Sequence, residues 1–197
     1  MIRISVSRNL AEHPFVPAMG VEDFAEVERV LLLALRSLQH DELHGSYTPL
    51  AALDEATLAS LKADGLYAEA VDPPYHAAAT SRDGLLPVHR AASGVFRAAN
   101  GQLAAWVNAS DHLQVVGAQR NGSARSVFEA VHSCLAFVEK VLLEQGKTYA
   151  LHRRLGYVGA CPSLVGTSMR VHVRVALPAL TATGSASLGE VAAEYGL

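Results

Sequence analysis

The segment LGYVGACPSLVGTSMRVHVRVALPA, residues 155–179, joins a glycine-punctuated Cys-Pro turn to a stretch in which apolar residues alternate with others. This alternation has the period of two that is typical of a half-buried β-strand. It predicts that one face of the strand lies in the core and that the other face carries Arg170, His172 and Arg174. Because guanidinium groups bind phosphate through a rigid fork of donors, the second face is either a floor for a polyanion or a solvated surface.

Composition favours one globular domain inside the cell. The chain has 197 residues, of which 50% are hydrophobic and 18% charged, so residues 1–197 can bury a core as a single domain. A net charge of −3 argues against a nucleic-acid-binding protein. We find neither a signal peptide nor an apolar run approaching the roughly 20 residues of a membrane span. The two cysteines, Cys134 and Cys161, fit a reducing compartment, either the cytoplasm or an organelle.

The rest of the chain predicts helices and strands in mixed order. Helical spacing of apolar residues predicts helices over residues 22–38, 54–62 and 123–145. Residues 96–118 predict a strand pair, and residues 72–94, with two consecutive prolines, predict a surface excursion. The expected buried side of the longest helix comprises Val127, Phe128, Val131, Leu135, Val138 and Leu142.

Five segments carry recognisable motifs in one collinear order. Residues 3–15 are similar to S-T-R-V-R-x-x-R-S-L…Y-P-F, residues 41–50 to G-E-L-x-G-x-Y-x-P-L, residues 106–113 to W-x-N-E-E-D-H-L, residues 161–174 to C-P-S/T-N-L-G-T-x-M/V/L-R-A-S-V-H, and residues 189–193 to a late E-V-A-A helix. All of these motifs belong to the phosphagen kinases, the ATP:guanido phosphotransferases that include arginine kinase and creatine kinase. The chain therefore resembles the C-terminal catalytic domain of that family, in a degenerate and truncated form.

The resemblance implies an α/β (α+β) fold of the phosphagen kinase and glutamine synthetase-like type, with a large, mostly antiparallel sheet flanked by helices. Arg3, Trp106, Gln114 and Arg170 are then expected on neighbouring central strands, with the two long helices on the opposite face. The family's N-terminal helical domain is expected to be absent. So is its C-terminal substrate loop V-R-G-T-R-G-E-H-T-E, because the chain ends at Leu197.

Some site residues of the family are retained in this sequence. Arg3 and Arg170 match arginines that contact nucleotide phosphates, and Arg174 stands at the position of a histidine near the adenine. These three residues are the candidate nucleotide-binding set. Cys161 matches the family's reactive cysteine, and Ser163 beside it could lower the thiol pKa. Because the guanidine-binding carboxylates are replaced, a structural remnant is the favoured interpretation of this cysteine.

Other site positions depart from the family pattern. Ser5 and Gln114 stand where the resemblance implies arginines, Gly65 where it implies a nucleotide-contacting histidine, and Ser110 where it implies a glutamate. Phosphoryl transfer needs cations around the phosphates and carboxylates that orient the guanidinium. The departures therefore predict that phosphotransfer has been lost.

Two functions follow from this comparison of motifs. The first is a structural or regulatory subunit that binds protein partners through the excursion at residues 72–94 or through a strand edge left open after Leu180. Such a subunit needs no cofactor, although residual binding of ADP or ATP with Mg²⁺ is compatible with it. The second is an ATP:guanido phosphotransferase that binds ATP and ADP and is active, or is completed by another chain.

Four further residues are expected to play no chemical role. Cys134 lies among apolar residues of the longest predicted helix and is expected in the core. His112 is expected to be a hydrogen-bonded histidine at a strand end, not a base. His40 and His44 lack the glutamate and the helical context of a zinc motif, so no metal site is predicted.

Overall fold

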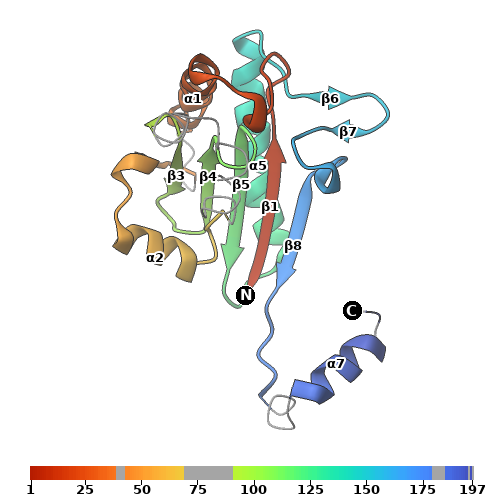
Figure 1. Ribbon diagram of the computed structural model, residues 1–197. Coiled ribbons are helices and arrows are strands. Elements are labelled where there is room, and N and C mark those ends of the chain that lie inside the picture. Colours follow the sequence, from red (N-terminus) through yellow and green to blue (C-terminus); the bar gives the residue numbers. More distant parts are fainter. Residues whose placement is uncertain (39–42, 69–90, 179–184, 195, 197) are drawn as a thin grey trace.

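The computed structural model describes residues 1–38, 43–68, 91–178, 185–194 and 196. Its centre is one sheet of antiparallel strands (Figure 1). In spatial order the strands are β2 (Gly45–Pro49), β3 (Gly94–Ala98), β4 (Leu103–Val107), β5 (Leu113–Gln119), β1 (Ile2–Arg8) and β8 (Met169–Val173). A separate short hairpin pairs β6 (Leu151–His152) with β7 (Gly156–Tyr157). A large antiparallel sheet was the predicted architecture, and it is confirmed.

Helices lie on both faces of the sheet. The long helices α1 (Val21–Arg36) and α5 (Ala124–Glu144) cover one face, and α2 (Glu55–Ala63) lies on the other (Figure 1). The described residues also include α7 (Ser185–Glu194) and three short 3₁₀ turns, at Val16–Ala18, Leu50–Ala52 and Pro162–Leu164. In the described part of the chain, no helix is both long enough and apolar enough to cross a bilayer.

The longest helix forms where the sequence predicts it. Its N-cap Ser123 accepts a hydrogen bond from the backbone N–H of Ser126, which satisfies an otherwise unpaired donor of the first turn. Its predicted buried positions are confirmed except for one: Phe128 is 45% exposed. Phe128 lies beside the buried stripe, about 100° around the helix from Val127, so the sheet does not cover it. Gly117 of β5 allows α5 to pack closely on the sheet, because a Cβ at this position would lie only 2.8 Å from Val131 of α5.

The strand register decides which side chains share a face. β1 pairs Ser7 with Gln114 of β5 and Ser5 with Arg170 of β8, and β4 pairs Trp106 with Gln114. Paired residues in an antiparallel sheet point to the same side, as do residues two apart on one strand. One face therefore carries Arg3, Ser5, Trp106, Gln114 and Arg170. This is the face opposite α1 and α5, as predicted. The strands of Arg3, Trp106, Gln114 and Arg170 are neighbours, as predicted, but Arg170 lies on the last strand of the sheet and not on a central one.

The predicted burial of the alternating strand is wrong. The side chains of Met169, Val171, Val173 and Val175 are 39–64% exposed. β8 is the last strand of the sheet, and α5 packs on β1 and β5. The alternation does separate two faces, but in the described part of the chain no second layer covers the apolar one. The predicted edge after Leu180 begins among residues 179–184, and most of the predicted excursion falls within residues 69–90; both stretches lie outside the described residues.

Candidate functional site

The guanidinium of Arg3 is bonded to the main chain that follows α2. Its Nε donates to the carbonyl of Gly65, and one terminal nitrogen donates to the carbonyl of Tyr67, both at 3.0 Å. These bonds join β1 to a segment more than sixty residues away in sequence. In the structure, Arg3 therefore holds this segment against the sheet.

Gly65 has a structural reason to be glycine. Its φ of +75° lies in the left-handed region, and a Cβ there would meet the side chain of Met1 at 3.0 Å and that of Ala118 at 3.4 Å. The histidine that the family resemblance implies at this position would be strained in this backbone. Gly65 thus ends α2 in a conformation that presents its carbonyl to Arg3.

The segment after α2 also covers Trp106. The indole Nε1 donates to the carbonyl of Leu66 at 2.8 Å, and the ring meets Tyr67 edge to face, with centroids 5.5 Å apart. Trp106 is 1% exposed and packs in a second core cluster that includes Leu61 of α2. This side of the sheet is therefore a packed layer around Trp106 and a polar strip that runs from Gln114 of β5 across β1 to β8.

Neutral side chains occupy two positions of that polar strip where arginines were implied. Ser5 is 4% exposed and is directly opposite Arg170. Gln114 lies on β5, and its Oε1 is buried without a hydrogen-bond partner among the residues that the structure describes. Neither side chain can supply positive charge to a phosphate.

Cys161, Ser163 and Arg170 form a contiguous polar cluster that joins the Cys-Pro turn to this face. The Sγ of Cys161 lies 3.0 Å from the Oγ of Ser163, which accepts a hydrogen bond from Arg170 at 3.3 Å. Hydrogen bonds from the hydroxyl and the backbone N–H of Ser163, helped by the charge of Arg170, lower the pKa of the Cys161 thiol. The thiol is exposed. The structure thus brings together two residues that the sequence singled out separately.

Arg174 lies just beyond β8. Its backbone exchanges two hydrogen bonds of 2.8 Å with Met1, which extends the β1–β8 pairing by one step. Alternation places its side chain on the face that carries Arg170. Neither arginine forms an ion pair with any residue that the structure describes.

The corner between β4 and β5 is held by polar bonds that the sequence analysis missed. Asn9 donates to Asp111 at 2.8 Å and accepts from the backbone N–H of His112 at 3.0 Å. Ser110 contacts Asp111 at 3.4 Å, so its hydroxyl faces the neighbouring carboxylate. Asn108 adopts a left-handed φ of 53° and donates to the carbonyls of Phe24 and Ala92. Of these residues, only Asn108 could have been noticed from the sequence, because it lies between Trp106 and the pair Asp111-His112 in the recognised motif.

Comparison with known proteins identifies the family. Residues 26–197 match the family model described as ATP:guanido phosphotransferase, C-terminal catalytic domain. The chain belongs to the ATP:guanido phosphotransferase family. The predicted membership is thereby confirmed. A flagellar creatine kinase of Strongylocentrotus purpuratus is 33% identical over 180 residues, which are 91% of this chain and 15% of that protein. An arginine kinase of Penaeus vannamei is 31% identical over 195 residues, which are 99% of this chain and 51% of that protein.

Solved structures of the family share the fold. A lombricine kinase superposes with a TM-score of 0.79 at 28% identity, covering 95% of this chain and 50% of that one. The duplicated taurocyamine kinase of Schistosoma mansoni, with bound components of a transition-state analogue, gives a TM-score of 0.80 at 27% identity and covers 98% of this chain and 25% of that one. The chain thus spans about half or less of the length of these relatives.

No metal centre is found in this phosphagen kinase-like domain among the described residues. There, no group of three or more His, Cys, Asp or Glu side chains could hold an ion. His44 is described, whereas His40 lies outside the described residues. Cys134 is fully buried in the core as expected, and burial raises the pKa of its thiol to about 12.

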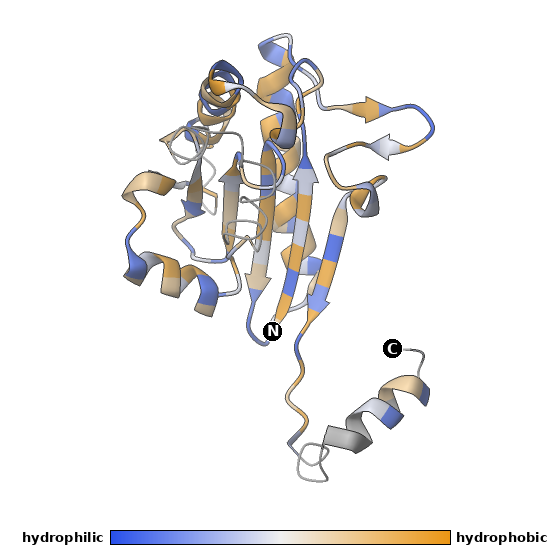
Figure 2. Ribbon diagram, in the orientation of Figure 1, coloured by the Kyte–Doolittle hydropathy of each residue, from blue (hydrophilic) through white to orange (hydrophobic). Residues whose placement is uncertain are grey.

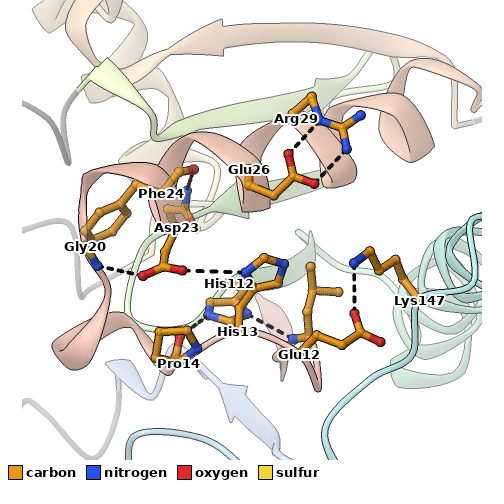
Figure 3. Close-up of polar contacts among 12 residues, drawn as sticks. Glu12, His13, Pro14, Gly20, Asp23, Phe24, Glu26, Arg29, His112 and Lys147 are labelled. Atoms are coloured by element: carbon orange, nitrogen blue, oxygen red, sulfur yellow. Dashed lines mark hydrogen bonds and ion pairs between the residues drawn. The ribbon is translucent and has the colours of Figure 1, made fainter.

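His112 is a buried structural residue, as predicted. Its Nδ1 accepts the backbone N–H of Leu10, and its Nε2 donates to the carbonyl of Pro14, both at 2.9 Å (Figure 3). Because the first bond needs a bare Nδ1, the ring is neutral. Burial lowers the pKa of His112 to about 4. Nearby, His13 lies 3.8 Å from Asp23, which also accepts from the backbone of Gly20 at the start of α1 (Figure 3).

His112 should make the domain sensitive to acid. Its folded-state pKa of about 4 lies below its ordinary value of 6.5, so the unfolded chain takes up a proton first as the pH falls. The stability from neutral His112 is fully present above pH 6.5 and is lost as the pH falls towards 4. The free energy of unfolding should fall by about 3 kcal/mol over this window.

Urea unfolding at pH 7 and at several lower values measures this loss. The control is His112→Asn, whose side-chain oxygen can still accept from Leu10 but cannot titrate. Its stability at pH 7 should be lower and its pH dependence flatter than that of the unmodified protein. Equal pH dependence in the two proteins would contradict the assignment.

Proposed function

We propose that this phosphagen kinase-like domain, residues 1–197, does not transfer phosphoryl groups and serves as a structural or regulatory subunit that binds other proteins. The observation that carries the proposal is that Arg3 is bonded to the main chain and that a neutral residue follows it on the same sheet face. Arg3 donates to two main-chain carbonyls, and the next position on the same face is the neutral Ser5. The sheet face around Arg3 and Ser5 therefore offers fewer positive side chains than the chemistry of the family needs.

The chemistry explains why this reduction matters. The transition state of phosphoryl transfer spreads negative charge over the phosphate oxygens, so catalysis depends on preorganised positive groups. Ser5 and Gln114 contribute none, and the hydroxyl of Ser110 cannot hold a guanidinium as a carboxylate does. Arg170 and Arg174 remain at the exposed edge, where their interactions are screened by salt. No cofactor is needed for the proposed role.

Weak nucleotide binding is expected from the arginines that remain. Calorimetric titration with ADP and Mg²⁺ at physiological salt should give a Kd of roughly 1 mM or weaker, which corresponds to about 4 kcal/mol. An Arg170→Ala, Arg174→Ala double variant should abolish even this signal, while Arg29→Ala, at an exposed site on α1, should leave it unchanged. A micromolar Kd would overturn the proposal and favour the alternative, a nucleotide-binding phosphotransferase.

A further inference from the structure

The backbone bonds of β8 to β1 follow a fixed alternation. Met1 and Arg174 exchange both backbone hydrogen bonds at 2.8 Å, and the N–H of Ser7 donates to the carbonyl of Ser168 at 3.1 Å. In an antiparallel pair, such bonded residues recur at every second position. The even-numbered residues from Ser168 to Arg174 therefore direct their backbone groups to β1.

The odd-numbered residues direct their backbone groups the other way. The N–H and C=O groups of Met169, Val171 and Val173 point to the open side of the sheet, because β8 is its last strand (Figure 1). We call these three residues, with the groups they expose, the β8 edge. No backbone hydrogen bond to the β8 edge comes from any residue the structure describes. Such a row of unpaired groups is a template for an added strand.

The side chains of the β8 edge form an exposed apolar row. They are paired with apolar residues of β1, such as Ile4 opposite Val171, and so point to the face covered elsewhere by α5. The exposed fractions are 39% for Met169, 50% for Val171 and 63% for Val173. Figure 2 shows this alternation of hydrophobic and hydrophilic residues along the strand.

The opposite face of the same strand is cationic. Arg170, His172 and Arg174 alternate with the apolar row, and none of them has an acidic partner among the residues the structure describes. The edge thus offers three complementary features to an approaching strand: main-chain donors and acceptors, an apolar row on one face and a basic row on the other.

We infer that the β8 edge binds an extended segment of a partner protein in which acidic residues alternate with apolar ones. This inference rests on the proposed function, since it names the surface by which the subunit would bind. An added strand places its side chains directly beside those of β8, so acidic residues would lie next to Arg170, His172 and Arg174, and apolar residues next to Val171. Main-chain bonds supply affinity, and the alternation supplies specificity.

Charge argues against a second copy of this chain as the occupant. If two β8 strands paired antiparallel about a twofold axis at His172, with their apolar rows on one face, Arg170 would lie opposite Arg174 of the other copy. Like charges directly opposite one another destabilise a strand pair. A register shifted by one residue would place basic side chains against apolar ones. The charge pattern of β8 therefore favours a partner strand with acidic side chains over a second copy of this chain.

A pair of synthetic peptides tests the inference on the unmodified protein. The probe is a fluorescein-labelled peptide of about seven residues with repeated Val-Glu, and its matched control has repeated Val-Lys. By fluorescence anisotropy, the Val-Glu peptide should bind about tenfold or more tightly than the Val-Lys peptide. Hydrogen exchange should show new protection at the amides of Met169, Val171 and Val173, and little change at His172, which already bonds to β1.

Variants separate the backbone contribution from the charge contribution. Val171→Pro removes one outward N–H without removing a bond to β1, and proline is tolerated on strand edges. It should weaken the Val-Glu peptide about tenfold, whereas Val171→Thr should not. Arg170→Glu with Arg174→Glu should reverse the preference towards the Val-Lys peptide. Circular dichroism confirms that each variant is folded, and the hydrogen-exchange result stands on the unmodified chain if one is not.

The outcomes are distinguishable from those for the proposed function. Equal affinity for both peptides, or absence of protection at the β8 edge, would overturn the inference whether or not the protein turns over ATP. Light scattering that shows a dimer abolished by Val171→Pro would overturn it in favour of a second copy. ATP turnover would overturn the proposed function and leave the peptide preference as it is.

Discussion

Purified protein should form no ADP above background when it is supplied with ATP, Mg²⁺ and arginine, creatine or a protein-arginine substrate. Each preorganised charge-stabilising donor that is lost lowers the rate of a reaction about 100- to 1000-fold. Ser5 and Gln114 are two such losses on the sheet face, and Ser110 adds the loss of a carboxylate. Although such effects are not strictly additive, together they leave little turnover.

A coupled ADP assay, with an active arginine kinase as the positive control, measures this expectation. Restoring two positions, Ser110→Glu and Gln114→Arg, should not restore activity, because Ser5 and Gly65 still differ from the family pattern. The added arginine would also lie beside the packed ring of Trp106. Turnover that disappears in Arg170→Ala would refute the proposal of an inactive domain.

Replacing Trp106 by alanine should lower the free energy of unfolding by about 3–5 kcal/mol. The ring is 1% exposed, packs among residues of β3, β5 and α2, and bonds the carbonyl of Leu66. The substitution therefore creates a cavity and leaves a buried acceptor unpaired. It also removes the support of the segment to which Arg3 is bonded.

Urea unfolding of two further variants separates the contribution of the ring volume from that of the hydrogen bond to Leu66. Trp106→Phe keeps most of the ring volume but loses the donor to Leu66, so it should cost about 1–3 kcal/mol. Phe128→Ala, at a position 45% exposed on α5, is the control for loss of an aromatic ring and should cost clearly less than Trp106→Ala. Similar costs at Trp106 and Phe128 would mean that the layer around Trp106 does not stabilise the fold.

Several parts of the fold could be predicted from local sequence. The N-cap Ser123 and the spacing of apolar residues predicted α5 within one residue at each end. Asp54, which accepts from the N–H of Thr57, marked the start of α2 in the same way. These features depend on contacts between residues three or four apart, so the local sequence contains what is needed to predict them.

Motif order predicted the family, and the residue types at matched positions raised the question of lost activity. Neither depends on three-dimensional contacts, because a serine or glutamine cannot carry positive charge wherever it lies. Arg3 is the opposite case. Its identity suggested a phosphate contact, but its bonds to Gly65 and Tyr67 could be known only once the chain had folded.

The strand from Met169 to Val173 shows the same division between sequence and structure. The sequence by itself determined that apolar and basic residues occupy opposite faces, because alternation is a property of the extended backbone. Only the tertiary structure decided that β8 is the edge strand, with its apolar row exposed and its outward N–H groups unpaired within the described chain. Burial depends on what packs against a face, and that is set by strand order and by helices distant in sequence.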